Sequence, residues 1–316
     1  MANMNNYQEF IKQTLEHGVK GKKRNDDQTI SMFGGQLEFD LSEGFPLYTG
    51  RKIALGQALA EHYWFISGST NRHDLNKLRG CKFWDEFENE EGDIGPLYGR
   101  QWRKERIVWN ADPKERKAIV LDPIKEMLAG VMADVDSRRY ILSAYNYLES
   151  PLPEYLPDAT IERNHAAGLM SIGPCHTLSQ YSIFDGKLNC HLYMRSSDIC
   201  IGLPYNIAGY AIMLALFANV TKRSVGKLVI SFGDRHIYGD HIAGAKELIS
   251  RQIPDSPALD ISDLELPVFT GLINNPSRKM RYSDKLAKEI NDEIDLILSR
   301  LKDYTPLDPV SFRMYK

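Results

Sequence analysis

Cysteine is scarce in this sequence, and none of the cysteines is spaced as a paired ligand. The 316 residues contain four cysteines and no CxxC pair, and the histidines show no metal-ligand spacing. This scarcity argues against a disulfide framework and against a cysteine–histidine metal site. We therefore expect free thiols, no metal and a reducing, cytoplasmic environment.

A strong charge of either sign and a long hydrophobic run are also missing. The net charge is −3, which indicates no wholesale binding of nucleic acid. No window approaches the roughly 18 apolar residues of a membrane helix, and the polar start, MANMNNYQEF, is unlike a secretory signal. The apolar segment at 210–220 is too short to span a membrane, so we expect a buried helix there.

The sequence does have the length and apolar content of a large core. Its hydrophobic content of 43% is enough for one large domain, or for a domain with appendages. Helical periodicity predicts helices that end at Gly18 and Gly68, a helix across 124–132, and a charged helix at 283–303 capped by Ser283. Strands and helices mix without strict βαβ order, which favours an α+β fold.

Two segments have the alternation and the turn residues of β-hairpins. The first alternates on either side of Gly34 and Gly35, and the second places Asp185 and Gly186 between two alternating runs. Residues 149–171 contain three prolines and no clear period, so we expect a long loop or insertion there.

The segment GPCHTLSQY places Cys175 between a proline and a histidine, just before a strand-like run. A nucleophilic cysteine reacts as the thiolate, which a nearby cation stabilises. The second predicted hairpin returns beside this run and ends at Arg195, so an arginine is expected near the thiol. The residues alone also allow a buried structural cysteine and a surface arginine.

Several segments together closely resemble the thymidylate synthase family. In chain order they are WDEFENEEGDIGPLYGRQWR, DSRR, PCH, DGKLNCHLYMRSSD, GLPYNIAGYA and GDRHIYGDH. The resemblance runs from about Tyr7 to about His241, and only 149–171 and the residues after about 245 fall outside it. It implies a single α+β domain with a large mixed sheet covered by helices, in a homodimer built sheet against sheet.

The resemblance also implies a reaction. The family joins a one-carbon unit from 5,10-methylenetetrahydrofolate to C5 of the uracil ring of dUMP. Cys175 matches the nucleophile that adds to C6 and thereby makes C5 electron-rich. Glu61 matches the general acid/base, and Tyr98 matches a residue on the proton-transfer side.

A phosphate site is implied in the same way. Arg195 and Ser196 match groups that bind the nucleotide phosphate. Arg138 and Arg139 match a pair that is donated across the dimer interface to the partner's phosphate site. The family's further phosphate-binding arginine lies in a glycine-containing loop that this chain lacks, and Arg24 is its candidate substitute.

Asn206 matches the amide that reads the pyrimidine. An asparagine can donate to O4 and accept from N3–H, which fits uracil, whereas an aspartate suits the amino group of cytosine. The remaining matches are His236 and Tyr238 for the sugar hydroxyl, His176 and Gln180 for order within the pocket, and Trp84, Asp198 and Arg51 for the folate side.

Two departures from the family bear on the product. Phe87 stands where the family has a second tryptophan, and the last residues, 314–316, do not match the family tail, although Tyr304 and Pro306 match its start. In the family this tail closes over folate and excludes water, which permits hydride transfer. Hydride transfer would yield dTMP and dihydrofolate.

Two alternatives stay open. Capture of water would yield 5-hydroxymethyl-dUMP, as in the hydroxymethylases used to make modified viral DNA, and would place the protein in a host cytoplasm. A non-catalytic regulator that binds dUMP, folate or RNA is a third possibility. The joint presence of Cys175, Glu61, Asn206 and Arg195 argues against it.

Overall fold

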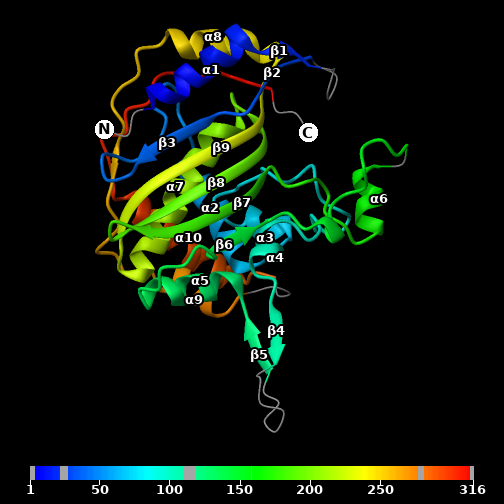
Figure 1. The fold of residues 1–316 in the computed structure, drawn as a ribbon, viewed down its shortest axis with the longest axis vertical. Coiled ribbons are helices and arrows are strands. Elements are labelled where there is room, and N and C mark those ends of the chain that lie inside the picture. Colours follow the sequence, from blue (N-terminus) through cyan, green and yellow to red (C-terminus); the bar gives the residue numbers. More distant parts are fainter. Residues whose placement is uncertain (1–3, 22–27, 110–117, 158, 277–280, 314–316) are drawn as a thin grey trace.

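The computed structural model describes residues 4–21, 28–109, 118–157, 159–276 and 281–313. Its centre is a seven-stranded mixed sheet, and α2 (Leu55–Ser67) and α7 (Gly202–Thr221) lie behind the long strands in the view of Figure 1. The predicted α+β class with a large mixed sheet is confirmed.

Seven strands form the central sheet: β1 (Val19–Lys20), β2 (Thr29–Phe33), β3 (Gln36–Asp40), β6 (Ile141–Ser143), β7 (His176–Phe184), β8 (Lys187–Asp198) and β9 (Ser224–Tyr238). The order is β1-β2-β9-β8-β7-β6, and β3 also pairs with β9. Among the described strands of this sheet, β8 and β9 run parallel and the other neighbours run antiparallel. The long strands β8 and β9 therefore form its middle.

Two pairs of short strands lie outside the sheet: β4 (Arg106–Trp109) with β5 (Ala118–Leu121), and β10 (Ala258–Leu259) with β11 (Leu301–Lys302). The α-helices of the described residues are α1 (Asn5–His17), α2 (Leu55–Ser67), α3 (Arg72–Asn76), α4 (Tyr98–Trp102), α5 (Pro123–Met132), α6 (Ile161–Ala166), α7 (Gly202–Thr221), α8 (Ile242–Ser250), α9 (Pro267–Asn274) and α10 (Asp284–Leu298). Two 3-10 turns complete the list, η1 (Tyr147–Glu149) and η2 (Gly239–His241).

Helix α7 is the central helix of the core. It packs against α2 and against β8 and β9, and 15 of its 20 residues are buried. It is longer than the predicted buried segment and is long and apolar enough to cross a membrane, but 78% of its apolar window is buried inside the protein. The predicted buried helix is therefore confirmed, and its hydrophobicity is explained by packing.

The predicted hairpin around Gly34 and Gly35 is wrong. Strands β2 and β3 do not pair with each other; both pair with β9, from Thr29 opposite Tyr238 to Asp40 opposite Lys227. The two glycines have φ angles of 85° and 129° and form an irregularity between the strands. A hairpin and an interrupted strand both produce alternating residues on either side of two glycines, so the sequence pattern does not distinguish them. Here the 15-residue β9 is long enough to pair with both halves.

The hairpin of β7 and β8 is confirmed. Asp185 and Gly186 have φ angles of 51° and 71°, as a two-residue turn with positive φ at both positions requires. The pairing brings the end of β8 next to the start of β7, and the Arg195 amide donates to the Cys175 carbonyl at 2.9 Å. The turn chemistry therefore places the arginine beside the cysteine.

The segment 149–171 is not a loop throughout. It contains α6, whose first turn is capped by Thr160, and it projects from the body of the molecule (Figure 1). The helix predicted at 283–303 does begin at the Ser283 cap, but it ends at Leu298. Its chain then continues as β11, which pairs with β10.

Candidate active site

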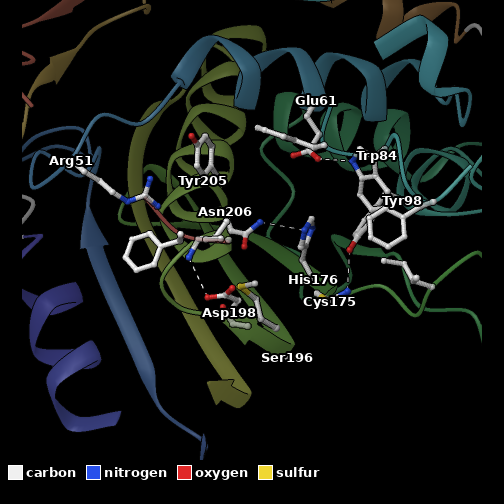
Figure 2. Close-up of a pocket in the computed structure, with 18 of the residues that line it drawn as sticks. Arg51, Glu61, Trp84, Tyr98, Cys175, His176, Ser196, Asp198, Tyr205 and Asn206 are labelled. Atoms are coloured by element: carbon white, nitrogen blue, oxygen red, sulfur yellow. Dashed lines mark hydrogen bonds between the residues drawn. The ribbon is translucent and has the colours of Figure 1, made fainter. Parts of the chain in front are cut away.

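A cavity of about 460 Å³ opens beside Cys175 at the carboxyl end of β8 (Figure 2). Its walls come from α2, the loop at 83–87, α4, the start of β7, the end of β8, the start of α7 and the C-terminal segment. Of the residues that the sequence singles out, the cavity is lined by Arg51, Glu61, Trp84, Tyr98, Cys175, His176, Ser196, Asp198 and Asn206.

Cys175 is held in the cavity wall by hydrogen bonds to its own backbone and to its neighbours. Its amide donates to the Tyr98 hydroxyl oxygen at 3.0 Å. Arg195 donates to the Pro174 carbonyl at 2.9 Å and to the Gly173 carbonyl at 2.5 Å, so its guanidinium wraps the loop that carries the thiol. Burial raises the pKa of Cys175, and the positive charge of Arg195 offsets part of that rise.

Glu61 is a partly buried residue on α2 whose carboxyl group points into the cavity (Figure 2). The indole Nε1 of Trp84 donates to its Oε1 at 2.7 Å. Burial raises the pKa of Glu61 to about 7, and the Trp84 hydrogen bond acts in the opposite direction. A carboxyl group that titrates near neutral pH can both give and take a proton there.

His176 connects the nucleophile's strand to Asn206. Its ring stacks on Tyr98 with centroids 4.4 Å apart, and burial lowers its pKa to about 3, so the ring is neutral at pH 7. The Asn206 amide nitrogen lies 3.4 Å from Nε2, and the Tyr210 hydroxyl lies 3.3 Å from Nδ1. An amide nitrogen only donates, so Nε2 accepts and the ring proton is on Nδ1. This arrangement orients the Asn206 amide.

His236 and Tyr238 lie near the cavity but do not line it. Asp198 pairs with His236 across β8 and β9, which brings both residues to the same end of the sheet. His236 Nδ1 is 2.8 Å from Asp234 Oδ1, and the His236 and Tyr238 rings pack edge to face at 5.3 Å. Both side chains are buried.

Gln180 does not line the cavity. The register shifts between His176 and Leu178, and this bulge turns the following side chains to the opposite face of the sheet. Gln180 therefore points to the outer face, where its amide donates to the Arg138 carbonyl at 3.2 Å. Gln180 was expected in the pocket from the family resemblance, and the sequence of the strand contains no sign of this bulge.

Of the described residues predicted to bind phosphate, Ser196 lines the cavity, whereas Arg195, Arg138 and Arg139 do not. Arg138 and Arg139 are exposed in the turn after α5, ahead of β6. They line no part of the cavity of their own chain and lie together at a separate surface hollow. Arg24 lies outside the described residues.

The C-terminal segment forms part of the cavity wall, through Val310 and Phe312. Hydrogen bonds tie this segment down along its length: the Leu307 amide donates to the Thr49 carbonyl at 2.8 Å, and Arg251 donates to the Asp308 carbonyl at 2.6 Å. The match at Tyr304 pointed to a closing tail, but the sequence did not identify these two cavity residues. Both are apolar residues in a mostly polar terminal segment, and this feature of the sequence could have indicated that they pack against the protein.

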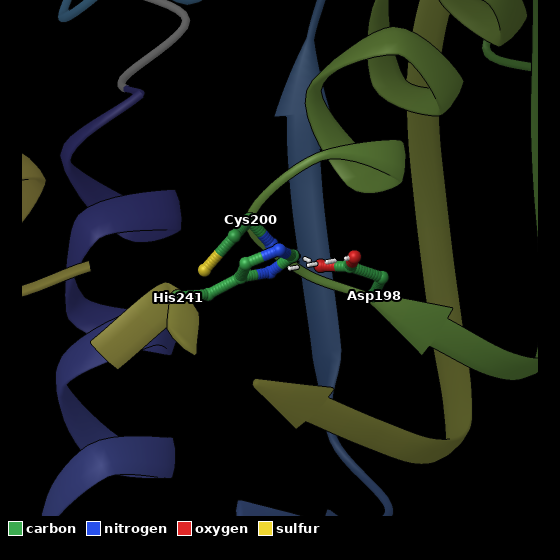
Figure 3. A group of neighbouring side chains, drawn as sticks. All are labelled: Asp198, Cys200 and His241. Atoms are coloured by element: carbon green, nitrogen blue, oxygen red, sulfur yellow. Dashed lines mark hydrogen bonds and ion pairs between the residues drawn. The ribbon is translucent and has the colours of Figure 1, made fainter. Parts of the chain in front are cut away.

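Asp198, Cys200 and His241 form a group whose potential ligand atoms lie within 4.8 Å of one another (Figure 3). Asp198 and His241 form hydrogen bonds with the protein backbone. Asp198 accepts from the amides of Cys200 and Ile201 at 2.9 and 3.2 Å, and His241 Nε2 is 2.6 Å from the Arg313 carbonyl. Burial acts to lower the pKa of His241, but the hydrogen bond and charge of Asp198 outweigh it and raise the pKa. The group thus links the end of β8 to the tail.

His62, the residue after Glu61, is buried between α2 and α7. Its Nδ1 lies 2.9 Å from the Ala58 carbonyl, and its side chain is tight against Gly209, where an added Cβ would come within 2.3 Å of the ring. Burial lowers the pKa of His62 from 6.5 to about 4. Between these values the unfolded chain binds a proton that the folded protein does not, so stability falls as the pH decreases.

Replacing His62 with leucine should therefore make folding less sensitive to acid. Between pH 7 and pH 5 we expect the free energy of unfolding of the parent protein to fall by about 2 kcal/mol more than that of the variant. Urea unfolding at both pH values measures the difference, and the packing cost of the substitution cancels. Equal pH dependence in the two proteins would contradict the buried neutral histidine.

A family model described as thymidylate synthase matches residues 5–272 of the 316-residue chain. The match contains Cys175, Glu61 and Asn206 and most of the cavity wall. Val310 and Phe312 lie beyond it, so the tail contributes to the cavity from outside the matched region.

Proposed function

Because this chain belongs to the thymidylate synthase family, we propose that it converts dUMP to dTMP by reductive methylation with 5,10-methylenetetrahydrofolate. The family transfers a one-carbon unit to dUMP and uses methylenetetrahydrofolate as the co-substrate. The observation that carries the proposal is the meeting of the Cys175 thiol, the Glu61 carboxyl and the Asn206 amide in one cavity.

The proposed reaction begins with the sulfur of Cys175. Its thiolate adds to C6 of uracil, and the electrons of the C5–C6 double bond move toward the C4 carbonyl, which makes C5 nucleophilic. Asn206, held by His176, accepts from N3–H and donates to O4. C5 attacks the methylene carbon of methylenetetrahydrofolate and forms a carbon–carbon bond. Loss of the C5 proton then breaks the bond between this carbon and the folate nitrogen, which releases tetrahydrofolate and leaves an exocyclic methylene on the ring. For methylation, tetrahydrofolate transfers a hydride to the methylene and becomes dihydrofolate.

Glu61 moves protons in this scheme. A pKa of about 7 lets it take the proton that leaves C5 and return one, through water, to the ring carbonyl. Elimination of the Cys175 sulfur from C6 restores the aromatic ring and the free thiol. Arg195 and Ser196 bind the phosphate, and His236 with Tyr238 bind the sugar.

Apolar side chains in the cavity wall favour hydride transfer over capture of water. Val310 and Phe312 of the tail close one side, and the Phe312 ring lies 5.6 Å from the guanidinium carbon of Arg51. Trp84 and Phe87, whose ring centroids are 5.6 Å apart, form an apolar wall on the folate side. Apolar side chains here disfavour water and leave the exocyclic methylene available for hydride.

Mass spectrometry of the nucleotide product tests this proposal. The protein is incubated with dUMP and methylenetetrahydrofolate, and a product heavier than dUMP by CH₂ supports methylation. A product heavier by CH₂O would replace methylation with hydroxymethylation. Recovery of unchanged dUMP would contradict both reactions and favour a binding protein.

We also propose that the active form is a homodimer in which Arg138 and Arg139 reach the partner's phosphate site. Both are exposed, and they adjoin an outer sheet face that carries partly exposed apolar side chains on three adjacent strands. These side chains are Ile141, Leu178 and Tyr193, with exposed fractions of 42%, 36% and 40%. A second copy would cover this face and complete the cluster of positive charge around the phosphate.

Mixing two inactive variants should restore activity if the arginines act across the interface. One variant carries Cys175→Ser, and the other carries Arg138→Ala with Arg139→Ala. A hybrid dimer then has one site with an intact cysteine and intact arginines, so random exchange of subunits gives about a quarter of the parent activity. Activity no higher than that of the separate variants would contradict donation across the interface.

A further inference from the structure

The segment 149–171 is tied to the cavity through a buried asparagine. Asn164 on α6 is 4% exposed; its Oδ1 accepts from the Leu152 amide at 2.8 Å and its Nδ2 donates to the Ser171 carbonyl at 3.2 Å. Asn164 thus connects residues near the two ends of the segment, Leu152 and Ser171. Ser171 in turn donates from its amide to the Ile94 carbonyl at 3.2 Å and directly precedes Ile172, a cavity residue.

The next residue of α6 makes a second connection, to a different wall. His165 Nε2 lies 3.0 Å from the carbonyl oxygen of Phe87, and because a carbonyl only accepts, the ring nitrogen donates. Phe87 lines the cavity and packs on Trp84, which donates to Glu61. A continuous line of contacts therefore runs from α6 to the carboxyl group in the cavity.

The loop that carries Phe87 is held at several points by hydrogen bonds and ion pairs, which include the donation of Trp84 to Glu61 and of Asn71 to the Glu91 carbonyl. Residues 77–97 contain turns and no helix or strand. The Phe87 amide donates to the Trp84 carbonyl at 3.1 Å, and Glu88 pairs with Arg72. These contacts keep the loop folded, but they hold the amide and the neighbouring residue, whereas His165 holds the carbonyl of the residue whose ring forms the wall. Loss of His165 should therefore shift this wall without unfolding the protein.

We infer that the segment 149–171 braces the folate side of the cavity, with His165 as a positioning residue for the Phe87 wall. The inference rests on the proposed function for the identity of the co-substrate, but not for the brace itself. The nucleotide side is held by other elements, at Arg195, Asn206 and His236. The effect of His165 should thus be confined to methylenetetrahydrofolate.

The kinetic test compares His165→Ala with His165→Gln and with His17→Ala. Glutamine offers an amide N–H at about the reach of Nε2, and His17 is an exposed histidine at the end of α1 with a side chain 68% exposed. We expect His165→Ala to raise the KM for methylenetetrahydrofolate about fivefold, the effect of one neutral hydrogen bond. The Kd for dUMP should stay unchanged, His165→Gln should recover most of the loss, and His17→Ala should match the parent protein.

Hydrogen exchange tests the brace independently of activity. In His165→Ala, the amides of residues 83–91 should exchange faster than in the parent protein, with protection restored in His165→Gln and unaltered in His17→Ala. Equal protection in all four proteins would overturn the brace. An unchanged KM for methylenetetrahydrofolate, or equal losses for both substrates, would overturn its role on the folate side. A parent protein that is inactive on dUMP would instead remove the proposed function, and the exchange result would still decide the brace.

Discussion

Replacing Cys175 with serine should reduce the formation of product from dUMP by at least about a thousandfold, because a neutral hydroxyl is a far weaker nucleophile than a thiolate. The oxygen differs little in size from sulfur, so the cavity and its Arg195 contacts should persist and dUMP should still bind. Turnover measured by product analysis, together with the Kd for dUMP, separates these two effects.

Cys190→Ser is the matched control for this change. Cys190 is a buried cysteine on β8, on the same sheet but outside the cavity, and its substitution is chemically identical. We expect it to keep turnover within a small factor of the parent value. A Cys175→Ser protein with turnover similar to that of Cys190→Ser would exclude covalent catalysis by Cys175.

Replacing Glu61 with glutamine should lower turnover by about 10² to 10⁴-fold, the range of a lost general acid/base. The parent protein should also show an inflection in its pH–rate profile near pH 7, because burial raises the pKa of Glu61 to about 7. Glutamine does not titrate, so this inflection should disappear in the variant. Turnover measured across the neutral range gives both results.

Trp84→Phe provides the control for the origin of that inflection. It keeps an aromatic ring in the wall but removes the indole that donates to Glu61 Oε1. In the parent protein this hydrogen bond lowers the pKa of Glu61, so its loss should raise that pKa. The inflection should therefore move to higher pH while catalysis is retained. An inflection that persists in Glu61→Gln would assign the titration to another group.

Of the cavity residues, Cys175 was singled out from its own neighbours, and His176, Ser196, Asp198 and Asn206 were expected from the family resemblance. Cys175, His176, Ser196, Asp198 and Asn206 come from neighbouring segments joined by one hairpin and one short connection, so local structure alone brings them close together. The family resemblance then supplied their expected roles.

The failures have a common origin in pairing and register. The strands around Gly34 and Gly35 were expected to pair with each other, but both find their partner in β9. Gln180 was expected in the pocket, but the bulge after His176 turns it to the outer face. The hairpin was expected from alternation and the position of Gln180 from the family resemblance. Neither source tells which distant strand is available as a partner or where the ladder shifts.

The sequence by itself determined the local chemistry: the Asp185–Gly186 turn, the helix that ends at Gly68, and the position of Arg195 at the end of a strand that returns beside Cys175. These features follow from the backbone preferences of adjacent residues. Only the tertiary structure decided that Phe312 lines the cavity and that His165 reaches the Phe87 carbonyl, 78 residues away in the chain. Such contacts join distant segments, and their positions result from the packing of the whole core, which no short stretch of residues specifies.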